Sequence, residues 1–318
     1  MKNWINDLLR GIYQVSSTLF RIMIPVLLLV KLLEEMGAVY YLSLLLEPLM
    51  ALVGLPESMG LVWATTLFTN IYGGMIMFFS VAQQETLSIA QVTVLSSMLL
   101  LAHTLPVEGR IAQKAGVRLG FTLLLRLTGA FVLGFILHHL YSWGGWLQQP
   151  NQLFWTPEMP EPGMINWAWR QLESLAIVQL IIIILMTLLK LLRLASVDRL
   201  LIWLLQPLLR LLGIGPAATT ITLIGITLGL AFGGGLLIKE AKAGHVSKRD
   251  VFSAMALLAL CHSLIEDTLL VMLLGADISG VLWMRLLFAL VVVTLLTRLV
   301  ARCSDGFHQR YLVTADSR

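Results

Sequence analysis

Residues 257–274 read LLALCHSLIEDTLLVMLL, an apolar run that holds a histidine, a glutamate and an aspartate within six positions. The run approaches the roughly 20 residues with which a helix crosses the hydrocarbon core of a bilayer. A charged side chain at the centre of such a helix costs about 3 kcal/mol on insertion scales, so it normally faces a partner or a water-filled cavity. The stretch therefore predicts a membrane helix that carries a polar site.

The remainder of the chain has the composition of a membrane protein. Hydrophobic residues make up 58% of its 318 residues and charged residues only 13%, which is more apolar side chain than one water-soluble core can bury. The run VQLIIIILMTLLKLL at 178–192 lacks the alternation of a transmembrane β-strand. We expect an all-α integral membrane protein whose main partner is the lipid bilayer.

The charges, the cysteines and the motifs argue against other classes of protein. The net charge of +4 is spread over short basic loops, which indicates membrane orientation and not nucleic-acid binding. The two cysteines, Cys261 and Cys303, imply no disulfide framework. Because no phosphate-binding loop and no further catalytic spacing is present, we expect neither enzyme activity nor a cofactor.

An internal repeat emerges when the chain is aligned with itself at an offset of 159 residues. LLEPLMALVG at 45–54 then matches LLQPLLRLLG at 204–213, and HTLPVE at 103–108 matches HSLIED at 262–267. An offset of that length predicts a duplicated half-protein and not a solenoid.

Each half contains five apolar segments, some of them short or broken. In the first half they lie at about 17–36, 38–53, 60–81, 89–109 and 118–140, and their counterparts follow 159 residues later. The segments at 38–53 and 199–214 either cross as short tilted spans or enter and return on one side. If they cross, all basic clusters fall on one face and the second half is inverted, as the positive-inside tendency requires. We therefore predict ten crossings in a bacterial cytoplasmic (inner) membrane, with both termini cytoplasmic.

The chain accordingly divides into five parts. They are an interfacial amphipathic helix at 1–16, membrane repeat 1 at 17–140, a Trp- and Pro-rich extracytoplasmic connector at 141–171, membrane repeat 2 at 172–300 and a cytoplasmic tail at 301–318. The connector holds aromatic residues that are expected to anchor it at the membrane interface, namely Trp143, Trp146, Trp155, Trp167 and Trp169.

Inverted repeats usually form their binding site near the midplane, where broken helices meet. On a continuous helix His262 and Glu266 share a face, with Asp267 at its edge. In the first half Pro106 is expected to disturb the helix and to bring His103 and Glu108 together.

Three roles are compatible with these groups. They can exchange a proton, bind a polar solute, or ligate a divalent metal through His103, His262, Glu266 and Asp267. Alternatively they pair with one another, or with Arg126 and Arg285, and only lock the halves together. The two arginines lie within about two turns of a span end, from which such a side chain can also snorkel to the interface.

The third segment of each half contains helix-opening residues. In the first half Thr69, Asn70, Gly73 and Gly74 fall at mid-membrane, where freed carbonyls and the Asn70 amide could meet a substrate. The second half reads GITLGLAFGGGLLIKE at 225–240, with Gly233 and Gly234 in corresponding places. Its glycines, spaced by four, also fit close helix packing.

The motifs TNIYGG, AFGGG and CHSLIEDTLLVMLLGADISG resemble the nucleoside-recognition, or Gate-domain, membrane proteins. Each half is similar to one of the spore maturation proteins A and B. The resemblance covers about 17–300 and implies a permease-like protein with matching positions at His262, Glu266, Asp267, Gly233 and Gly234. In the first half Pro106 and Val107 replace Ile265 and Glu266, so the two halves of the site differ.

We expect a secondary transporter for a small polar solute, nucleoside-like on the strength of the resemblance, with proton coupling. The alternatives are a divalent metal-ion permease and a non-transporting scaffold for envelope or spore-type machinery. The apolar outer faces also allow a homodimer, which no residue specifies.

Overall fold

The computed structural model describes residues 2–36, 46–82, 85–153, 163–211, 214–230, 235–236, 238–239, 245–300, 302 and 312. These residues form helices and no β-strand. The helices are α1 (Lys2–Glu35), α3 (Ser58–Phe68), α4 (Ile71–Val81), α5 (Ile89–Leu101), α6 (Leu105–Lys114), α7 (Leu119–Gly144), α8 (Met164–Leu194), α9 (Val197–Leu211), α10 (Pro216–Leu228), α12 (Lys248–Leu260), α13 (Glu266–Met272), the π-helical η2 (Ser279–Met284) and α14 (Arg285–Val300).

The helices have the lengths and surfaces of membrane helices. Within the described ranges, four helical segments are long and apolar enough to cross a bilayer: Ile89–Lys114, Leu119–Gly144, Met164–Leu192 and Ser279–Val300. Along α14 the exposed side is apolar, with Leu287, Val291, Leu295 and Leu299, while the buried side carries Arg285 and Thr297. A water-soluble helix has the reverse distribution. An exposed apolar face of this kind fits a helix that is surrounded by lipid.

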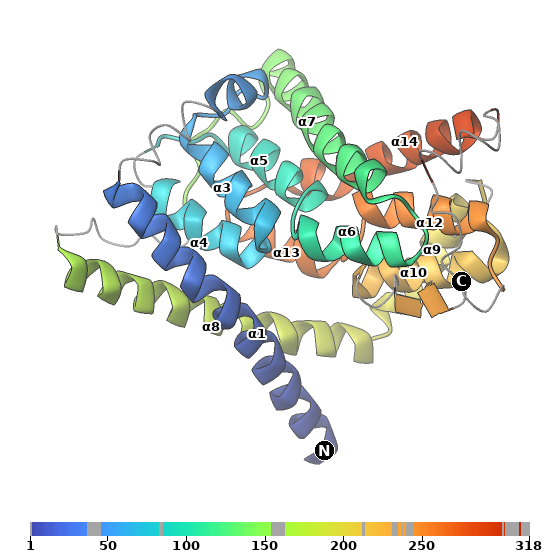
Figure 1. Cartoon of the computed structure of the whole chain (residues 1–318), viewed down its shortest axis with the longest axis horizontal. Coiled ribbons are helices and arrows are strands. Elements are labelled where there is room, and N and C mark those ends of the chain that lie inside the picture. Colours follow the sequence, from blue (N-terminus) through green and yellow to red (C-terminus); the bar gives the residue numbers. More distant parts are fainter. Residues whose placement is uncertain are drawn as a thin grey trace.

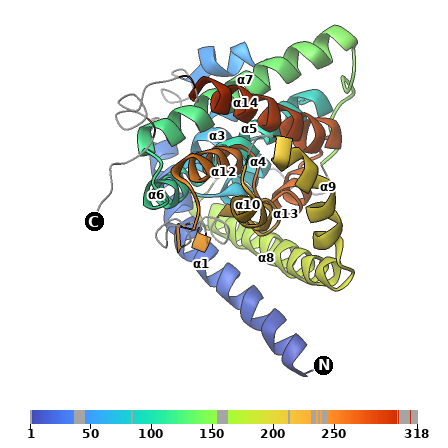
Figure 2. The same cartoon turned by 90° about the vertical axis from the view of Figure 1, so that its right-hand side faces the viewer.

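Long helices flank a core of short ones. α1 and α8 lie side by side along one flank, and α7 and α14 run along the opposite flank, as Figure 1 and Figure 2 show. α5, α6, α12 and α13 lie between them. These short helices are therefore flanked by long helices on two opposite sides.

The central helices α5 and α12 begin and end at residues that are 159 apart. Each starts at a serine whose hydroxyl accepts a hydrogen bond from a first-turn N–H, Ser88 from Gln91 and Ser247 from Asp250. Such a cap satisfies one of the free N–H groups at a helix start. The two sequences thus make the same local structure with different residues around the cap.

Both helices stop abruptly inside the protein. After Leu101 and Leu260 the chain leaves the helix, and Thr104 and Ser263 take left-handed conformations with φ of 50° and 47°. This conformation is unfavourable for residues with a side chain, and a hydrogen bond from Thr104 N–H to Thr66 C=O of 3.1 Å helps to hold the first one. The segment predicted as one span at 89–109 is therefore a pair of half-helices, α5 and α6.

The third segment of the first half, predicted as one span at 60–81, is divided into two short helices. α3 and α4 pack against each other as a hairpin (Figure 1). The Ser58 hydroxyl at its start donates to Glu85 Oε1 near its end, at 2.7 Å, so the two ends of the hairpin lie close together. Asn70 allows the turn because its side chain caps α4 by accepting from Gly73 N–H at 3.0 Å. The matching stretch is 219–240: its first part lies in α10, and most of 230–240 lies outside the described residues.

The two halves contact each other through direct hydrogen bonds near the ends of α5 and α7. Tyr141 Oη lies 2.8 Å from Ser279 Oγ, and Asp277 N–H donates to Thr93 Oγ1 at 2.9 Å. Nearby, Asn151 Nδ2 donates to Leu274 C=O at 2.8 Å. These bonds link helices that are far apart in sequence and fix how the halves meet.

Several helices run across the boundaries of the predicted divisions. α1 runs without interruption through the predicted interfacial helix at 1–16 and the predicted span at 17–36. α7 and α8 extend into the predicted connector at 141–171, where Trp143 and Trp169 are exposed. Trp155 and all of the tail at 301–318 except residues 302 and 312 lie outside the described residues.

Gly74 tests the packing of the hairpin. A Cβ at this position would collide with Thr66 Oγ1, so Gly74→Ala should destabilise the fold by about 1–3 kcal/mol, as overpacking does. Removing the obstacle with Thr66→Ala should recover part of this loss. Thermal unfolding in detergent measures both effects.

The matched control is Gly120→Ala on α7, where a Cβ meets nothing within 4 Å. This change should leave the melting temperature the same or raise it, since alanine favours the helix. Equal melting of the Gly74 and Gly120 variants would contradict the hairpin packing.

Candidate functional site

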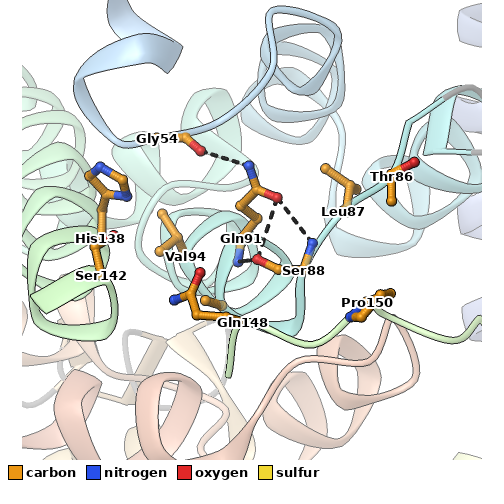
Figure 3. Close-up of a pocket in the computed structure, with 11 residues that line it drawn as sticks. Gly54, Thr86, Leu87, Ser88, Gln91, Val94, His138, Ser142, Gln148 and Pro150 are labelled. Atoms are coloured by element: carbon orange, nitrogen blue, oxygen red, sulfur yellow. Dashed lines mark hydrogen bonds between the residues drawn. The ribbon is translucent and has the colours of Figure 1, made fainter. Parts of the chain in front are cut away.

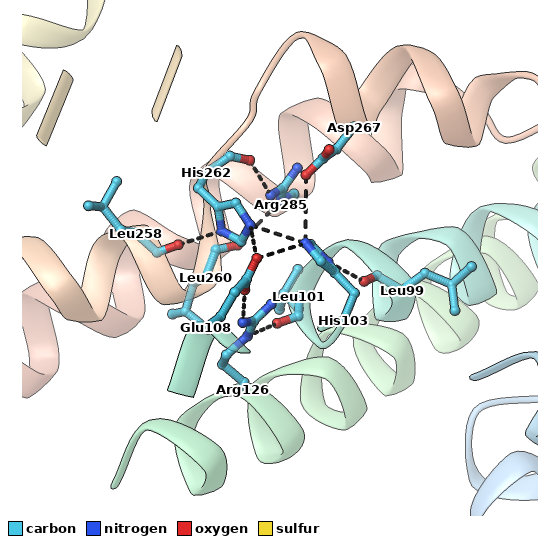
Figure 4. A network of polar contacts seen from close by, with 10 residues as sticks. All are labelled: Leu99, Leu101, His103, Glu108, Arg126, Leu258, Leu260, His262, Asp267 and Arg285. Carbon is cyan, nitrogen blue, oxygen red and sulfur yellow. Dashed lines mark hydrogen bonds and ion pairs between the residues drawn. The ribbon is translucent and has the colours of Figure 1, made fainter. Parts of the chain in front are cut away.

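Two buried histidines meet where α5 and α12 end. His103 and His262 follow these helices and are 5% and 2% exposed. Their Nε2 atoms lie 3.1 Å apart, and the residues are separated by 159 positions. Figure 4 shows the two rings pointing toward each other from opposite halves of the chain.

The other ring nitrogen of each histidine faces a backbone carbonyl. His103 Nδ1 lies 2.9 Å from Leu99 C=O, and His262 Nδ1 lies 2.7 Å from Leu258 C=O. These carbonyls belong to the last turn of a helix, where backbone donors are missing. Because a carbonyl can only accept, we assign the proton of each neutral ring to Nδ1, which leaves an unprotonated Nε2.

Two carboxylates complete the arrangement. Glu108 Oε1 lies 3.1 Å from His262 Nε2 and 3.4 Å from His103 Nε2. Asp267 Oδ2 lies 3.8 Å from His103 Nε2 and has no hydrogen-bond donor in the described part of the chain. Glu108 and Asp267 occupy matching places in the repeat. We call His103, His262, Glu108 and Asp267 the central cluster (Figure 4).

A buried arginine supports each side of the central cluster. Arg126 donates through Nε to Leu101 C=O at 2.8 Å and through Nη1 to Glu108 Oε2. Arg285 donates through Nε to Leu260 C=O at 3.3 Å and through Nη2 to His262 C=O at 2.7 Å. Both side chains are fully buried, so the interpretation that they snorkel to the membrane interface is wrong.

Hydrogen-bond acceptors converge at the central cluster, between the two buried arginines. The C-terminal ends of α5 and α12 meet there, and each helix end carries a partial negative charge. The unprotonated Nε2 atoms and the carboxylate oxygens are all hydrogen-bond acceptors. Acceptors that face one another at these distances need a proton or a metal ion between them.

Glu266 does not take the place that helical spacing predicted for it. α12 ends at Leu260 and α13 starts at Glu266, so the rule that places residues four apart on one face does not apply between His262 and Glu266. Asp267 is the acid that approaches His103, and Glu266 is partly exposed at the start of α13. The metal-capable group is accordingly His103, His262 and Asp267, without the predicted Glu266.

The predicted residues of the third segment lie at the turn of the hairpin. The Thr69 hydroxyl donates to Thr65 C=O at 2.7 Å, and the Asn70 side-chain oxygen caps α4. A Cβ at Gly73 or Gly74 would meet Thr69 or Thr66, so these glycines serve close packing. Gly233 and Gly234 lie outside the described residues.

The repeat offset contains a signal that reasoning from single helices missed. It aligns Glu108 with Asp267 and not with Glu266, and it aligns Arg126 with Arg285. The structure uses these same pairs at matching places around the central cluster.

A separate polar cavity of about 230 Å³ lies toward the outer ends of α5 and α7 (Figure 3). Ser88, Gln91, His138 and Gln148 contribute to its lining, and Gln91 Nε2 donates to Gly54 C=O at 3.0 Å. No residue of the central cluster lines this cavity. The cavity and the central cluster are therefore distinct features.

The helical fold, its spans of membrane length and its apolar outer surface define a multi-pass integral membrane protein. The chain is 31% identical over 294 residues to the uncharacterized membrane protein YvoD of Bacillus subtilis (strain 168), and the match covers 91% of each chain. It belongs to the same family of membrane proteins as YvoD. No family model and no solved structure matches the chain, so the resemblance to Gate-domain proteins stays a prediction.

Arg126 tests the role of the buried ion pair. Replacing it in Arg126→Met would leave Glu108 without its cation and Leu101 C=O without a donor. The loss of one partner of a buried pair costs about 3–5 kcal/mol, which thermal unfolding in detergent would register as a lower melting temperature. Adding Glu108→Gln should restore part of the stability.

Arg110→Met supplies the control, because Arg110 is exposed on the neighbouring helix α6. This change should alter the free energy of unfolding by no more than about 0.5 kcal/mol. If the Arg126 and Arg110 variants have the same melting temperature, the ion pair of Arg126 and Glu108 does not stabilise the site.

Proposed function

We propose that this protein is a secondary transporter of the cytoplasmic membrane, in which two halves of inverted topology share one central cation site. Transporters of this architecture bind their cargo where broken helices meet, and the ends of half-helices face the bound ion. The converging ends of α5 and α12 and the breaks at Thr104 and Ser263 support such a mechanism.

The observation that carries the proposal is the contact between the two histidines. Both Nδ1 atoms face carbonyl oxygens, and the Nε2 atoms approach to 3.1 Å. The contact is favourable when a cation lies between these nitrogens. Histidine exchanges protons near neutral pH, so a proton held there can couple transport to a proton gradient.

The size of the central cluster suggests the kind of cargo. Contacts of 3.1–3.8 Å join its acceptor atoms, which leaves space for one ion and not for a nucleoside-like solute. The proposed transporter therefore moves a small cation, or uses it as the coupling ion for a polar solute.

Inverted topology fits the distribution of charge. If the segment at 38–53, half of which lies outside the described residues, returns to its own side as the α3–α4 hairpin does, the first half crosses through α1, the α5–α6 pair and α7. An odd number of crossings inverts the second half, as ten crossings would, and leaves the basic clusters on the cytoplasmic face with both termini.

Matched cysteines test the inversion. Thr86 and His245 are exposed, 159 positions apart, and stand just before the serines that cap α5 and α12. In a background with Cys261→Ala and Cys303→Ser, Thr86→Cys should react with a membrane-impermeant thiol reagent from outside the cell. His245→Cys should react only after the cytoplasmic face is opened. Labelling of both from the same side would contradict inversion.

Transport is tested in proteoliposomes that contain a pH-sensitive dye and carry an imposed pH gradient. Uptake of Mn²⁺ or of labelled uridine, accompanied by a dye response, is expected for the wild-type protein. His262→Gln should reduce the uptake by about 10–100-fold, the range seen when even the supporting partners of an ion site are lost.

His139→Gln is the matched control for this experiment. His139 makes the same kind of contact, from Nδ1 to Phe135 C=O at 2.9 Å, but it is exposed on α7. Its uptake should equal that of the wild type. If the wild-type protein moves neither probe nor protons, the scaffold alternative takes precedence.

A further inference from the structure

We propose that the central cluster binds one divalent transition-metal ion through His103 Nε2, His262 Nε2, Asp267 Oδ2 and Glu108 Oε1. The binding of a metal ion does not depend on the proposed transport function. Only the role of the ion as cargo rests on that function. The ligand atoms offered by the two histidines and Asp267 all lie within 4.8 Å of one another.

The spacing of the ligand atoms matches a small tetrahedral site. Bonds of about 2.0–2.1 Å place neighbouring ligands roughly 3.3 Å apart around Zn²⁺. The triangle of the two Nε2 atoms and Glu108 Oε1 has sides of 3.1, 3.1 and 3.4 Å. Asp267 Oδ2 lies 3.8 Å from His103 Nε2 and within 4.8 Å of the offered His262 nitrogen, so it is the fourth ligand that would have to move closer.

The surroundings of the histidines are those of metal ligands. A metal-binding histidine nearly always donates its second ring N–H to a carboxylate, a carbonyl or water, which fixes the ring and its tautomer. Both rings have this partner, at Leu99 C=O and Leu258 C=O. The rings are thus held with their Nε2 lone pairs directed at the centre before any ion binds.

A metal ion would give Asp267 a partner that the hydrogen bonds of the described residues do not. Asp267 Oδ2 is buried, accepts no hydrogen bond from the described residues and lies 3.8 Å from His103 Nε2. Arg126 and Arg285 donate to carbonyls and to Glu108 Oε2, and one nitrogen of each guanidinium has no acceptor in the described part of the chain. An ion held by the two Nε2 atoms would bring the Asp267 carboxylate into the same site.

The donor set selects the class of metal. Imidazole nitrogen suits Zn²⁺, Fe²⁺, Co²⁺ and similar ions, whereas Mg²⁺ and Ca²⁺ prefer sites made of oxygen alone. Two imidazoles with two carboxylates therefore favour a transition-metal ion over the alkaline-earth ions.

The test is a Co²⁺ titration of the purified full-length protein in detergent after removal of metals with a chelator. Co²⁺ in a tetrahedral site absorbs visible light, so binding and geometry are read together. We expect one Co²⁺ per chain, displaced by Zn²⁺ and not by Mg²⁺. A protein that binds no Co²⁺ or Zn²⁺ at this centre overturns the metal site.

Two variants locate the site, so that the result does not depend on one substitution that could disturb folding. His262→Gln and Asp267→Asn should each weaken Co²⁺ binding by at least about tenfold, with unchanged elution on size exclusion. His139→Gln should bind as the wild type does. Equal binding by all three variants would place the Co²⁺ elsewhere and overturn the proposal.

Uptake of Mn²⁺ and uridine by the same preparations separates the two proposals. Stoichiometric Co²⁺ binding without uptake of either probe supports the metal site and overturns the transporter. Proton-coupled uptake of uridine without metal binding supports the transporter and overturns the metal site.

Discussion

The free carbonyls at two helix ends constrain the whole centre of this protein. α5 and α12 stop in the buried interior, and an unpaired polar group there costs several kcal/mol. The imidazole Nδ1 of the next histidine and the guanidinium of an arginine from α7 or α14 supply the missing donors. The histidine and the arginine therefore have a structural role, because they satisfy the last carbonyls of the helix. The same hydrogen bonds determine where their side chains lie at the centre.

The ends of the helices in turn depend on their neighbours. Thr104 and Ser263 reverse the chain in a conformation that is strained for residues with a side chain, and backbone bonds to Thr66 C=O and Ile226 C=O hold the two breaks. In the first half the acceptor belongs to the α3–α4 hairpin. The hairpin thus helps to position the break that precedes Glu108 and follows His103.

Much of the fold could be predicted from the sequence, because hydropathy and the repeat are properties of whole segments. The helical class, the membrane character and the start of α5 and α12 follow from them. The hairpin could not be foreseen, since an interrupted crossing and a returning pair of helices share the same apolar, glycine-containing pattern. The place of Asp267 could not be predicted either, because no proline near Ser263 indicates a break in the helix and an unbroken helix favours Glu266. In the first half Pro106 does indicate the break at Thr104.

The two halves do not use their matching residues identically. Arg126 grips the carboxylate of Glu108, whereas the corresponding Arg285 is bound to the His262 carbonyl and leaves Asp267 Oδ2 without a donor. One acid of the matched pair therefore accepts a hydrogen bond from its arginine while the other accepts none from the part of the chain that the structure describes, so the centre is asymmetric although the chain is duplicated.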